Sequence, residues 1–560
     1  MIRISKKILV VVSVTFILIA PGVISRSSPG VISGPYACDT WVVIKDASNT
    51  GRTMLGKNSD RPPFDCQPLI YHPKQVWTNG STVRLEYIDI PQVNITYATI
   101  GTSPYWCYGY EMGVNEYGVV AGNEALWTTV LKEAKSNPPQ RGLTGMDLLR
   151  LGLERGKTAH DAMTVITQLL EKYGQWGSGV PISNDEDGSY DNGFLIADPN
   201  EAWVLETAGK DWVAKCITTG TRSISNAPTI GSDWDEGTLP PETNFKLQYS
   251  DFMNVGPWPE SGITIQRRSS SLLDDYSSGE GVTLREMMAI ARDHKGSIPG
   301  ICMHQIPLIP SQTAGSWVVV LPNSANELIE IWWTPSLPCR GIYIPLFIDA
   351  NDFPDILSRT GKLEKSVSPP WNVSEDEFSM DSYWWLFKKA SESDMDSVTR
   401  ETFDNLETGF ESELDTIRKQ VVALKRENRE SDAAALLSNF SEKCVDFALS
   451  MLLKMRLPVL DTEPPTIANL FPADGSTTSK KRPTFSANFS DNMKVMGSMV
   501  EVYLDNVDIT QDTIITAEGF TYTPTEDLSI GNHTIKVVIY DVAGNGNTEE
   551  FKFIVENPIN

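Results

Sequence analysis

The sequence predicts an α+β fold followed by a separate all-β module. Over about the first 375 residues, runs of β-forming residues mix with helical segments without regular β-α alternation. A strongly charged helical stretch follows, and the last part of the chain contains only short strand-like runs separated by turns. We therefore divide the folded chain into residues 38–375, 376–457 and 462–557.

In the first part, hydrophobic and β-branched runs predict strands at 40–45, 53–58, 117–121, 193–197, 202–206 and 316–321. Residues 46–51 read Asp-Ala-Ser-Asn-Thr-Gly, which is turn chemistry and predicts that the first two strands form a hairpin. Helices are predicted at 144–154 and 158–172, and Thr158 is a suitable N-cap for the second.

Two further regions complete the chain. Apolar residues at helical spacing among many charges predict an amphipathic helix at 398–427 that packs on the first domain. After the Pro-containing linker at 461–466, strands are predicted at 484–489, 499–504, 533–540 and 550–555, with an Asp-Val-Ala-Gly-Asn turn at 541–545. This part resembles the immunoglobulin-like β-sandwich modules of surface proteins, which implies a spacer or adhesive role and association with the cell surface.

Composition excludes several classes of function. The 560 residues carry a net charge of −25, which repels phosphate backbones and argues against nucleic acid as a partner. Hydrophobic residues at 41% and charged residues at 21% fit a globular protein. The seven cysteines form no Cys-x-x-Cys pair and the five histidines no His-Glu-x-x-His motif. These absences argue against a zinc ribbon, a thioredoxin-like redox site and a zincin, and we expect no metal site.

The N-terminus has the pattern of an export signal. Lys6 and Lys7 precede an apolar run at 8–20, which Pro21 and Gly22 end. We expect residues 1–25 to be a signal peptide and 26–37, rich in Ser, Gly and Pro, to be a propeptide or processed linker. The alternative is a retained membrane anchor. The expected location is extracellular or at the cell surface.

Cys38 stands where the first strand begins, directly after this processed segment. Cleavage after Ala37 would give one residue both a thiol and a free α-amine. An α-amine has an ordinary pKa of about 8, so it can accept the thiol proton and later deliver it to a leaving nitrogen. The alternatives are a buried structural thiol, half of a disulfide, or a lipidated cysteine.

The predicted hairpin also indicates what surrounds Cys38. Its two strands would pair with residue numbers that sum to about 97, so that Cys38 faces Ser59 within a residue or two. We expect Asp60 to hold the α-ammonium group and Lys57 to lower the pKa of the thiol. The side chains predicted near the nucleophile are those of Lys57, Asn58, Asp60 and Arg61.

A series of motifs in order resembles a known family. The quoted segments are Ala-Cys-Asp-Thr at 37–40, Gly-Lys-Asn-Ser-Asp at 56–60, the Asn-Glu-x-Gly region at 113–124, the long run at 191–207, Arg-Ser-Ile-Ser-Asn-Ala-Pro at 222–228, Arg267-Arg268 and Trp384-Trp385. Together they resemble the dipeptidase/secernin family of N-terminal-nucleophile (Ntn) cysteine peptidases. More distant relatives are the choloylglycine hydrolases, penicillin V acylases and acid ceramidases. The resemblance covers about residues 37–455.

This resemblance implies an αββα sandwich with the helical segment 376–457 as its extension, and hydrolysis of amide bonds without a cofactor. It makes Cys38 the nucleophile, Asp60 the aspartate near the α-amine and Asn226 an oxyanion-hole donor. Four further residues would bind substrate or support the site. They are Lys57, where distant relatives carry arginine, Asn123 as a second asparagine, and either Arg267 or Arg268 as a buried arginine.

The expected function is therefore an exported cysteine dipeptidase that cleaves dipeptides or small peptides through a Cys38 thioester. Loss of the residues before Cys38 would activate it, and we favour self-processing because Pro35 suits signal peptidase poorly. Alternatives are an acylase acting on N-acyl amides, or an inactive protein that binds surfaces. The substrate, the disulfide pairing and any homo-oligomer stay open.

Overall fold

The computed structural model describes residues 38–250, 261–295, 300–306, 310–324, 326–350, 352–457 and 460–557. The expected signal peptide and propeptide, residues 1–37, lie outside these ranges. Among the helices of the described ranges, none is both long and apolar enough to cross a membrane.

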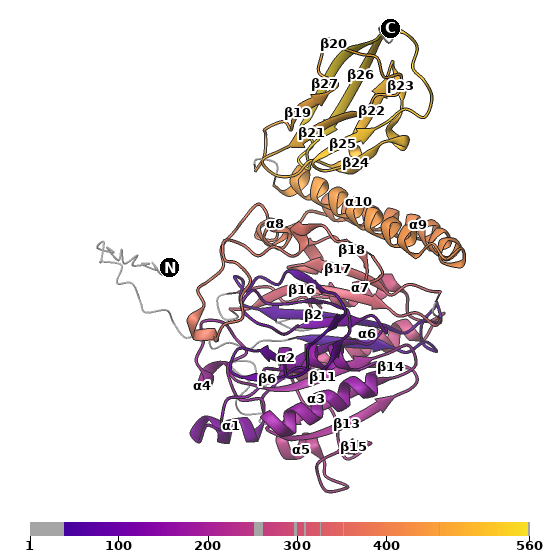
Figure 1. Cartoon of the computed structure of the whole chain (residues 1–560). Helices are drawn as coiled ribbons and strands as arrows, with labels where there is room; N and C mark the ends of the chain where they lie inside the picture. The colour runs from indigo at the N-terminus through magenta and orange to yellow at the C-terminus, as the bar shows by residue number, and fades with distance from the viewer. Residues whose placement is uncertain are drawn as a thin grey trace, which may run out of the picture.

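Two antiparallel sheets form the body of the first domain (Figure 1). The first sheet has six strands, and its central strand β2 lies between β1 and β16. In spatial order the strands are β14 (Thr221–Ile224), β1 (Asp39–Val43), β2 (Met54–Arg61), β16 (Gln312–Val320), β17 (Glu330–Pro335) and β18 (Ile344–Phe347).

The second sheet has eight strands and lies against the first through contacts of β10 and β11 with β1. Its order is β15 (Glu236–Gly237), β13 (Asp211–Ile217), β12 (Ala202–Ala208), β11 (Asp191–Ala197), β10 (Val120–Leu126), β9 (Met112–Asn115), β8 (Thr99–Thr102) and β3 (Leu69–His72). Between β3 and β8 the chain forms two short ribbons, β4 (Gln75–Val76) with β7 (Ile95–Thr96) and β5 (Thr82–Arg84) with β6 (Asp89–Pro91).

Helices cover the outer face of each sheet. Over the eight-stranded sheet lie α2 (Gly145–Arg155) and α3 (Ala159–Tyr173), and the Thr158 side chain caps α3 as the sequence predicted. Over the six-stranded sheet lie α6 (Ser261–Ser277), α7 (Leu284–Ala291) and α8 (Tyr383–Ala390). The remaining helices, α1 (Thr129–Ser136), α4 (Asp185–Gly188) and α5 (Phe245–Tyr249), are shorter. Two sheets between two helical layers make the expected αββα sandwich.

The register of the first hairpin agrees with the sequence prediction. Asp39 pairs with Asn58, Thr40 with Lys57 and Trp41 with Gly56, so that each pair sums to 97. β2 runs on to Arg61 because β16 pairs with it along its whole length. Asp60 therefore lies on a strand at the centre of the sheet.

The predicted strand at 117–121 is displaced in the structure. The backbone of Gly118 has a φ of +77°, and the Asn115 side chain accepts hydrogen bonds from the N–H groups of Tyr117 and Val119. These residues therefore form the turn between β9 and β10, and β10 begins only at Val120.

The helical extension and the β-sandwich complete the molecule. α9 (Ser397–Arg426) and α10 (Glu430–Arg456) form an antiparallel pair, and α10 packs on β18 (Figure 1). The C-terminal module has one sheet of β19 (Thr466–Phe471), β21 (Phe485–Ser490), β25 (Gly519–Tyr522) and β24 (Ile514–Thr516). The other sheet has β20 (Ser476–Thr478), β27 (Gly546–Val555), β26 (Gly531–Tyr540), β22 (Glu501–Leu504) and β23 (Val507–Asp508).

The sandwich rests on α10 through a buried ion pair. Lys494 binds Asp446 at 2.8 Å and Glu442 at 3.3 Å, and Asp446 is fully buried. The buried side chains of Met496 and Val542 belong to the same apolar cluster as α10. The module therefore contacts the helical extension (Figure 1).

A substitution at Gly56 would test how tightly the first hairpin is packed. A Cβ atom at Gly56 would lie 2.4 Å from the indole ring of Trp41, which is fully buried. We expect Gly56→Ala to lower the free energy of unfolding by roughly 1–3 kcal/mol through overpacking. Gly409 in α9 has open space at its Cβ, so Gly409→Ala should be neutral or slightly stabilising. Urea unfolding of both variants checks this, and an unchanged midpoint for Gly56→Ala would contradict it.

Candidate active site

Cys38 is held at both its nitrogen and its sulfur. Its backbone N–H donates to Asn226 Oδ1 at 2.7 Å, and the backbone N–H of Asp60 donates to its Sγ at 3.3 Å. The residue is 5% exposed and directly precedes β1, while Asn226 follows β14, the neighbouring strand. The structure therefore brings together the three residues that the sequence assigned to catalysis, Cys38, Asp60 and Asn226.

A buried cation lies beside the thiol. Lys57 is fully buried between the two sheets, and its Nζ donates to the Asn123 carbonyl at 2.5 Å and pairs with Glu124 at 3.4 Å. Thr40, directly opposite Lys57 in the hairpin, also hydrogen-bonds Glu124. One positive charge thus joins β2 of the first sheet to β10 of the second.

Burial and the charge of the partner residue shift the pKa in opposite directions, both for Lys57 and for Cys38. Burial alone would lower the pKa of Lys57, but the charges of Glu124 and Glu111, and that of Cys38 once it is a thiolate, raise it above its ordinary value, so this lysine stays protonated. Burial raises the pKa of the Cys38 thiol, and the charge of Lys57 opposes that rise without cancelling it. The thiol of this structure is therefore neutral near pH 7 and needs a base.

Two carboxyl groups flank Cys38 in the hairpin. Asp39 and Asp60 are both fully buried, and the hydroxyls of Ser225 and Thr313 lower the pKa of Asp39 and of Asp60, respectively, only in part. Burial raises the pKa of Asp39 to about 8, and burial together with the charge of Asp39 raises the pKa of Asp60 well above its usual range. Such carboxyl groups are unfavourable as anions unless a cation is added beside them.

Asn123 reaches the site only through its backbone. Its carbonyl accepts the Lys57 hydrogen bond, whereas its side chain donates to Asn192 at 3.1 Å. Asn123 pairs with Phe194, which belongs to the apolar core beneath α2 and α3. Since paired residues of an antiparallel sheet point to the same face, the Asn123 side chain lies on the helix side, away from Lys57. The expected role of this side chain at the nucleophile does not fit that position.

The arginine pair is not buried, contrary to the expectation. Arg267 is exposed, and the side chain of Arg268 is 26% exposed. Both lie on α6, which packs on the outer face of β1 and β14. Arg268 makes a two-pronged ion pair with Asp293, at 2.8 and 3.0 Å, and so ties α6 to the loop after α7. Two adjacent arginines in a helix point in different directions, and the sequence could not show which neighbour each would meet.

Besides Arg61, which the hairpin register predicted near the nucleophile, residues that the sequence did not single out lie near the thiol. Arg61 binds Asp65 at 2.7 Å and Glu111 at 3.2 Å, and all three are buried. The charge of Glu111 acts on the pKa of Cys38, and Cys38 and Arg61 in turn act on that of Tyr190, which burial raises. The hairpin register could have indicated Asp39, which adjoins the nucleophile. Glu111 and Tyr190 come from distant segments, and no local pattern marks them.

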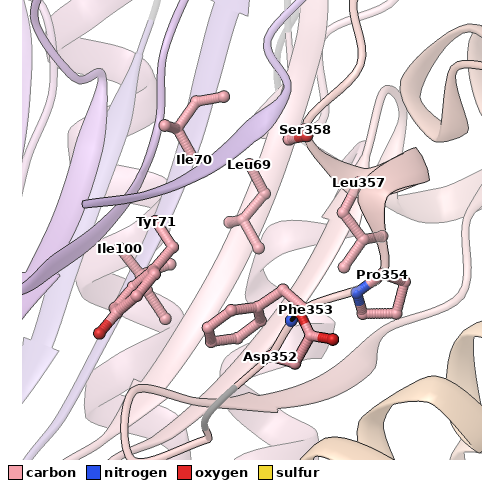
Figure 2. Close-up of a pocket in the computed structure, with 9 residues that line it drawn as sticks. All are labelled: Leu69, Ile70, Tyr71, Ile100, Asp352, Phe353, Pro354, Leu357 and Ser358. Carbon is pink, nitrogen blue, oxygen red and sulfur yellow. Dashed lines mark hydrogen bonds between the residues drawn. The ribbon is translucent and has the colours of Figure 1, made fainter. Parts of the chain in front are cut away.

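An apolar cavity of about 440 Å³ lies elsewhere, between β3 and the segment 352–358 (Figure 2). Phe353 and Leu357 face Leu69 and Tyr71 across it. Its lining includes neither Cys38 nor any other residue described above for the site. We therefore place the candidate active site at Cys38.

Two family models match segments of the chain. Residues 37–229 match Peptidase family C69, and residues 465–537 match a bacterial Ig domain. The first match contains Cys38, Lys57, Asp60, Asn123 and Asn226, and it ends before Arg267 and Arg268. The second confirms the immunoglobulin-like module.

Individual relatives cover only part of the chain. A dipeptidase of Bifidobacterium longum (strain NCC 2705) is 29% identical over 201 residues, which are 32% of this chain and 35% of that protein. The chain thus spans about a third of the length of this relative.

Two solved structures share lower identity. A variant of conjugated bile acid hydrolase from Clostridium perfringens has 13% identity over 59% of this chain and 98% of its own, with a TM-score of 0.35. The N-acylethanolamine-hydrolyzing acid amidase orthologue of Caenorhabditis elegans has 14% identity over 52% and 96%, with a TM-score of 0.25. Because these TM-scores are low, our description of the fold rests on the sheets and helices of this chain alone. Residues 37–229 are thus similar to Peptidase family C69, a family of cysteine-type hydrolases.

Proposed function

We propose that the chain is an exported cysteine dipeptidase whose nucleophile, Cys38, becomes N-terminal when residues 1–37 are removed. The observation that carries this proposal is the pair of contacts at Cys38, its nitrogen on Asn226 and its sulfur on the N–H of Asp60, beside the buried cation of Lys57. These contacts hold the nitrogen and the sulfur of one residue in fixed positions.

Removal of residues 1–37 would supply the missing base. In the uncleaved chain the nitrogen of Cys38 belongs to a peptide bond and cannot accept a proton. Hydrolysis of the Ala37–Cys38 bond turns it into an α-amine, whose N–H can still donate to Asn226 Oδ1 at the same position. That contact would orient the amine lone pair toward its own thiol.

The reaction then follows from these groups. The α-amine takes the proton of the Cys38 thiol, and the charge of Lys57 favours the resulting thiolate. The sulfur attacks the carbonyl carbon of the substrate amide, and the α-ammonium protonates the leaving nitrogen. Water then hydrolyses the thioester, which restores the thiol and releases the second product.

Asn226 is the proposed side-chain donor to the oxyanion. One N–H of its Nδ2 donates to the Ala125 carbonyl at 2.9 Å, which fixes the plane of the amide and leaves the second N–H for the substrate. A well-placed donor of this kind contributes about 2.7–4 kcal/mol to stabilising the transition state in hydrolases.

The buried carboxyl groups support the same processing step. Asp39 and Asp60 have raised pKa values because they are buried, and in Asp60 also because of the charge of Asp39. An α-ammonium group at Cys38 would add a positive charge next to both and would stabilise their anionic forms. Cleavage would therefore improve the electrostatics of a site that the uncleaved chain leaves unbalanced.

The proposed substrates are dipeptides, because the B. longum relative is a dipeptidase and the family match includes the nucleophile region. The proposed export rests on the basic and apolar pattern of the N-terminal segment.

The first test combines the mature N-terminus with activity. Secreted protein should begin at Cys38 by intact mass and should hydrolyse dipeptides. Cys38→Ala should lose activity by at least about 1,000-fold, since it lacks the nucleophile. If processing is autocatalytic, it should also keep the upstream residues. The control, Cys216→Ala, changes a partly exposed thiol on β13 and should behave like the native chain.

A protein that begins upstream of Cys38 and still cleaves dipeptides would refute the proposed base. Cleavage of N-acyl amides but not of dipeptides would make the chain an acylase on the same scaffold. Absence of any amidase activity after correct cleavage would favour the surface-binding alternative.

The pKa of Asp39 predicts a pH dependence of stability before cleavage. Because the folded pKa of about 8 exceeds the unfolded value of 3.8, folding takes up a proton, and stability falls as the pH rises from about 4 to 8. One carboxyl group of this kind lowers the free energy of unfolding by up to about 1.4 kcal/mol for each unit by which the pH rises in this range. In uncleaved Cys38→Ala protein, Asp39→Asn should therefore reduce the loss of stability between pH 5 and pH 8, as measured by urea unfolding. An equal loss in both proteins would contradict the assignment.

Truncation tests whether the C-terminal module takes part. A chain ending at residue 460 lacks the β-sandwich but keeps every residue of the site, so kcat/KM on dipeptides should change by less than about twofold. Some stability should be lost, because Asp446 loses its buried partner Lys494. Adding Asp446→Asn to the truncated chain should recover part of that loss. A folded truncated chain without activity would show that the module contributes to the site.

A further inference from the structure

Four side chains that bind metals readily meet on one side of the six-stranded sheet. They are His294, Cys302, His304 and Cys339, and their ligand atoms all lie within 4.8 Å of one another. His304 Nε2 is 3.1 Å from His294 Nε2, 3.2 Å from Cys339 Sγ and 3.7 Å from Cys302 Sγ. These residues take no part in the proposed hydrolysis.

The distances agree with those of a tetrahedral zinc site. Zinc bonds of about 2.0–2.1 Å to nitrogen and about 2.3 Å to sulfur place neighbouring nitrogens roughly 3.3 Å apart and a nitrogen and a sulfur roughly 3.6 Å apart. The observed distances of 3.1, 3.2 and 3.7 Å lie close to these values.

Hydrogen bonding explains the cluster less well. An imidazole Nε2 either carries one hydrogen or presents one lone pair, so it makes one good hydrogen bond. His304 Nε2 nevertheless lies near three polar atoms, those of His294, Cys302 and Cys339. A central cation accounts for this convergence, because each ligand then directs one lone pair to a common point.

The ligands come from three segments that the fold holds in place. His294 follows α7, Cys302 and His304 precede β16, and Cys339 lies in the short helix η1 (Pro338–Arg340). The N–H of Cys302 donates to the Asp293 carbonyl, and the Asp293 carboxylate binds Arg268. Arg292 donates to the Pro338 carbonyl, next to Cys339. The geometry of the four ligands is therefore supported by backbone contacts around them.

We propose that His294, Cys302, His304 and Cys339 bind one structural Zn²⁺ ion. Two thiolates and two imidazoles in a tetrahedral arrangement are the ligand set that zinc prefers. All four positions come from the protein, which is typical of structural rather than catalytic zinc. The site goes beyond the proposed dipeptidase function and does not depend on it.

The ion would support the residues that pair with Asp39 on β1 and with Asp60 on β2. Between two of its ligands, the backbone of Met303 exchanges hydrogen bonds with Thr313, the partner of Asp60 across β16. The carbonyl of Ile301 accepts from Asn58, the partner of Asp39 across the hairpin. A metal ion that fixes residues 300–304 would thus also fix Asn58 and Thr313, the strand partners of Asp39 and Asp60.

A Cys302–Cys339 disulfide is the competing state, since the two sulfurs are close and an oxidising compartment would favour it. The first measurement is the zinc content of the full-length native protein, purified without chelator and dialysed against metal-free buffer. It is paired with titration of the thiols in denaturant. We expect about one zinc per chain, with both Cys302 and Cys339 in the free thiol form by peptide mass.

Variants locate the metal. His294→Asn changes the most exposed ligand and should still fold, with zinc lowered at least about tenfold after dialysis and a lower Tm. Cys339→Ser should do the same. The matched controls, His160→Asn and Cys216→Ser, change a histidine and a cysteine outside the cluster and should keep the metal.

Cobalt gives a readout that does not depend on folding of the variants. Native protein reconstituted with Co²⁺ should show the visible absorption of tetrahedral cobalt bound to thiolates, and added Zn²⁺ should abolish it. Zinc content near zero with free thiols, a Cys302–Cys339 disulfide peptide in the purified protein, or equal loss of zinc in the controls would each overturn the proposal.

Discussion

The structure depends on one buried positive charge. Lys57 lies without solvent contact between two sheets, and its ammonium group bonds the Asn123 carbonyl and the Glu124 carboxylate among the described residues. Such a charge is tolerated only where partners are fixed in advance. The hairpin register and the approach of β10 to β2 are therefore coupled, and Cys38 stands next to Lys57 as a consequence of both.

The site places this cation among three buried acidic side chains. Asp39, Asp60 and Glu111 lie around a thiol whose pKa burial raises, so the described state suits a dormant nucleophile. A new α-ammonium group would change the charge balance and supply a base in the same event. This link between charge and processing is the physical core of the proposed function.

Support from outside the site comes through the loop between α7 and β16. Arg268, which the sequence suggested as an active-site residue, binds Asp293 in this loop, and the four proposed zinc ligands lie in or beside it. Residues 301 and 303 of this loop hydrogen-bond Asn58 and Thr313. These two residues pair with Asp39 and Asp60 in the sheet. An arginine outside the catalytic centre can in this way affect its geometry.

The sequence by itself determined the local structure: the first hairpin with its register, the helix capped by Thr158, and the immunoglobulin-like module. It also indicated that Lys57, Asp60 and Asn226 lie near Cys38. These follow from turn chemistry, capping, strand periodicity and family motifs, all of which act over short stretches of chain. Only the tertiary structure decided that the Asn123 side chain faces the helices, that Arg268 binds Asp293, that Glu111 joins the site and that His294, Cys302, His304 and Cys339 meet. Each of these depends on which face of a strand or helix meets a distant segment, and packing between layers sets that choice where no local pattern records it.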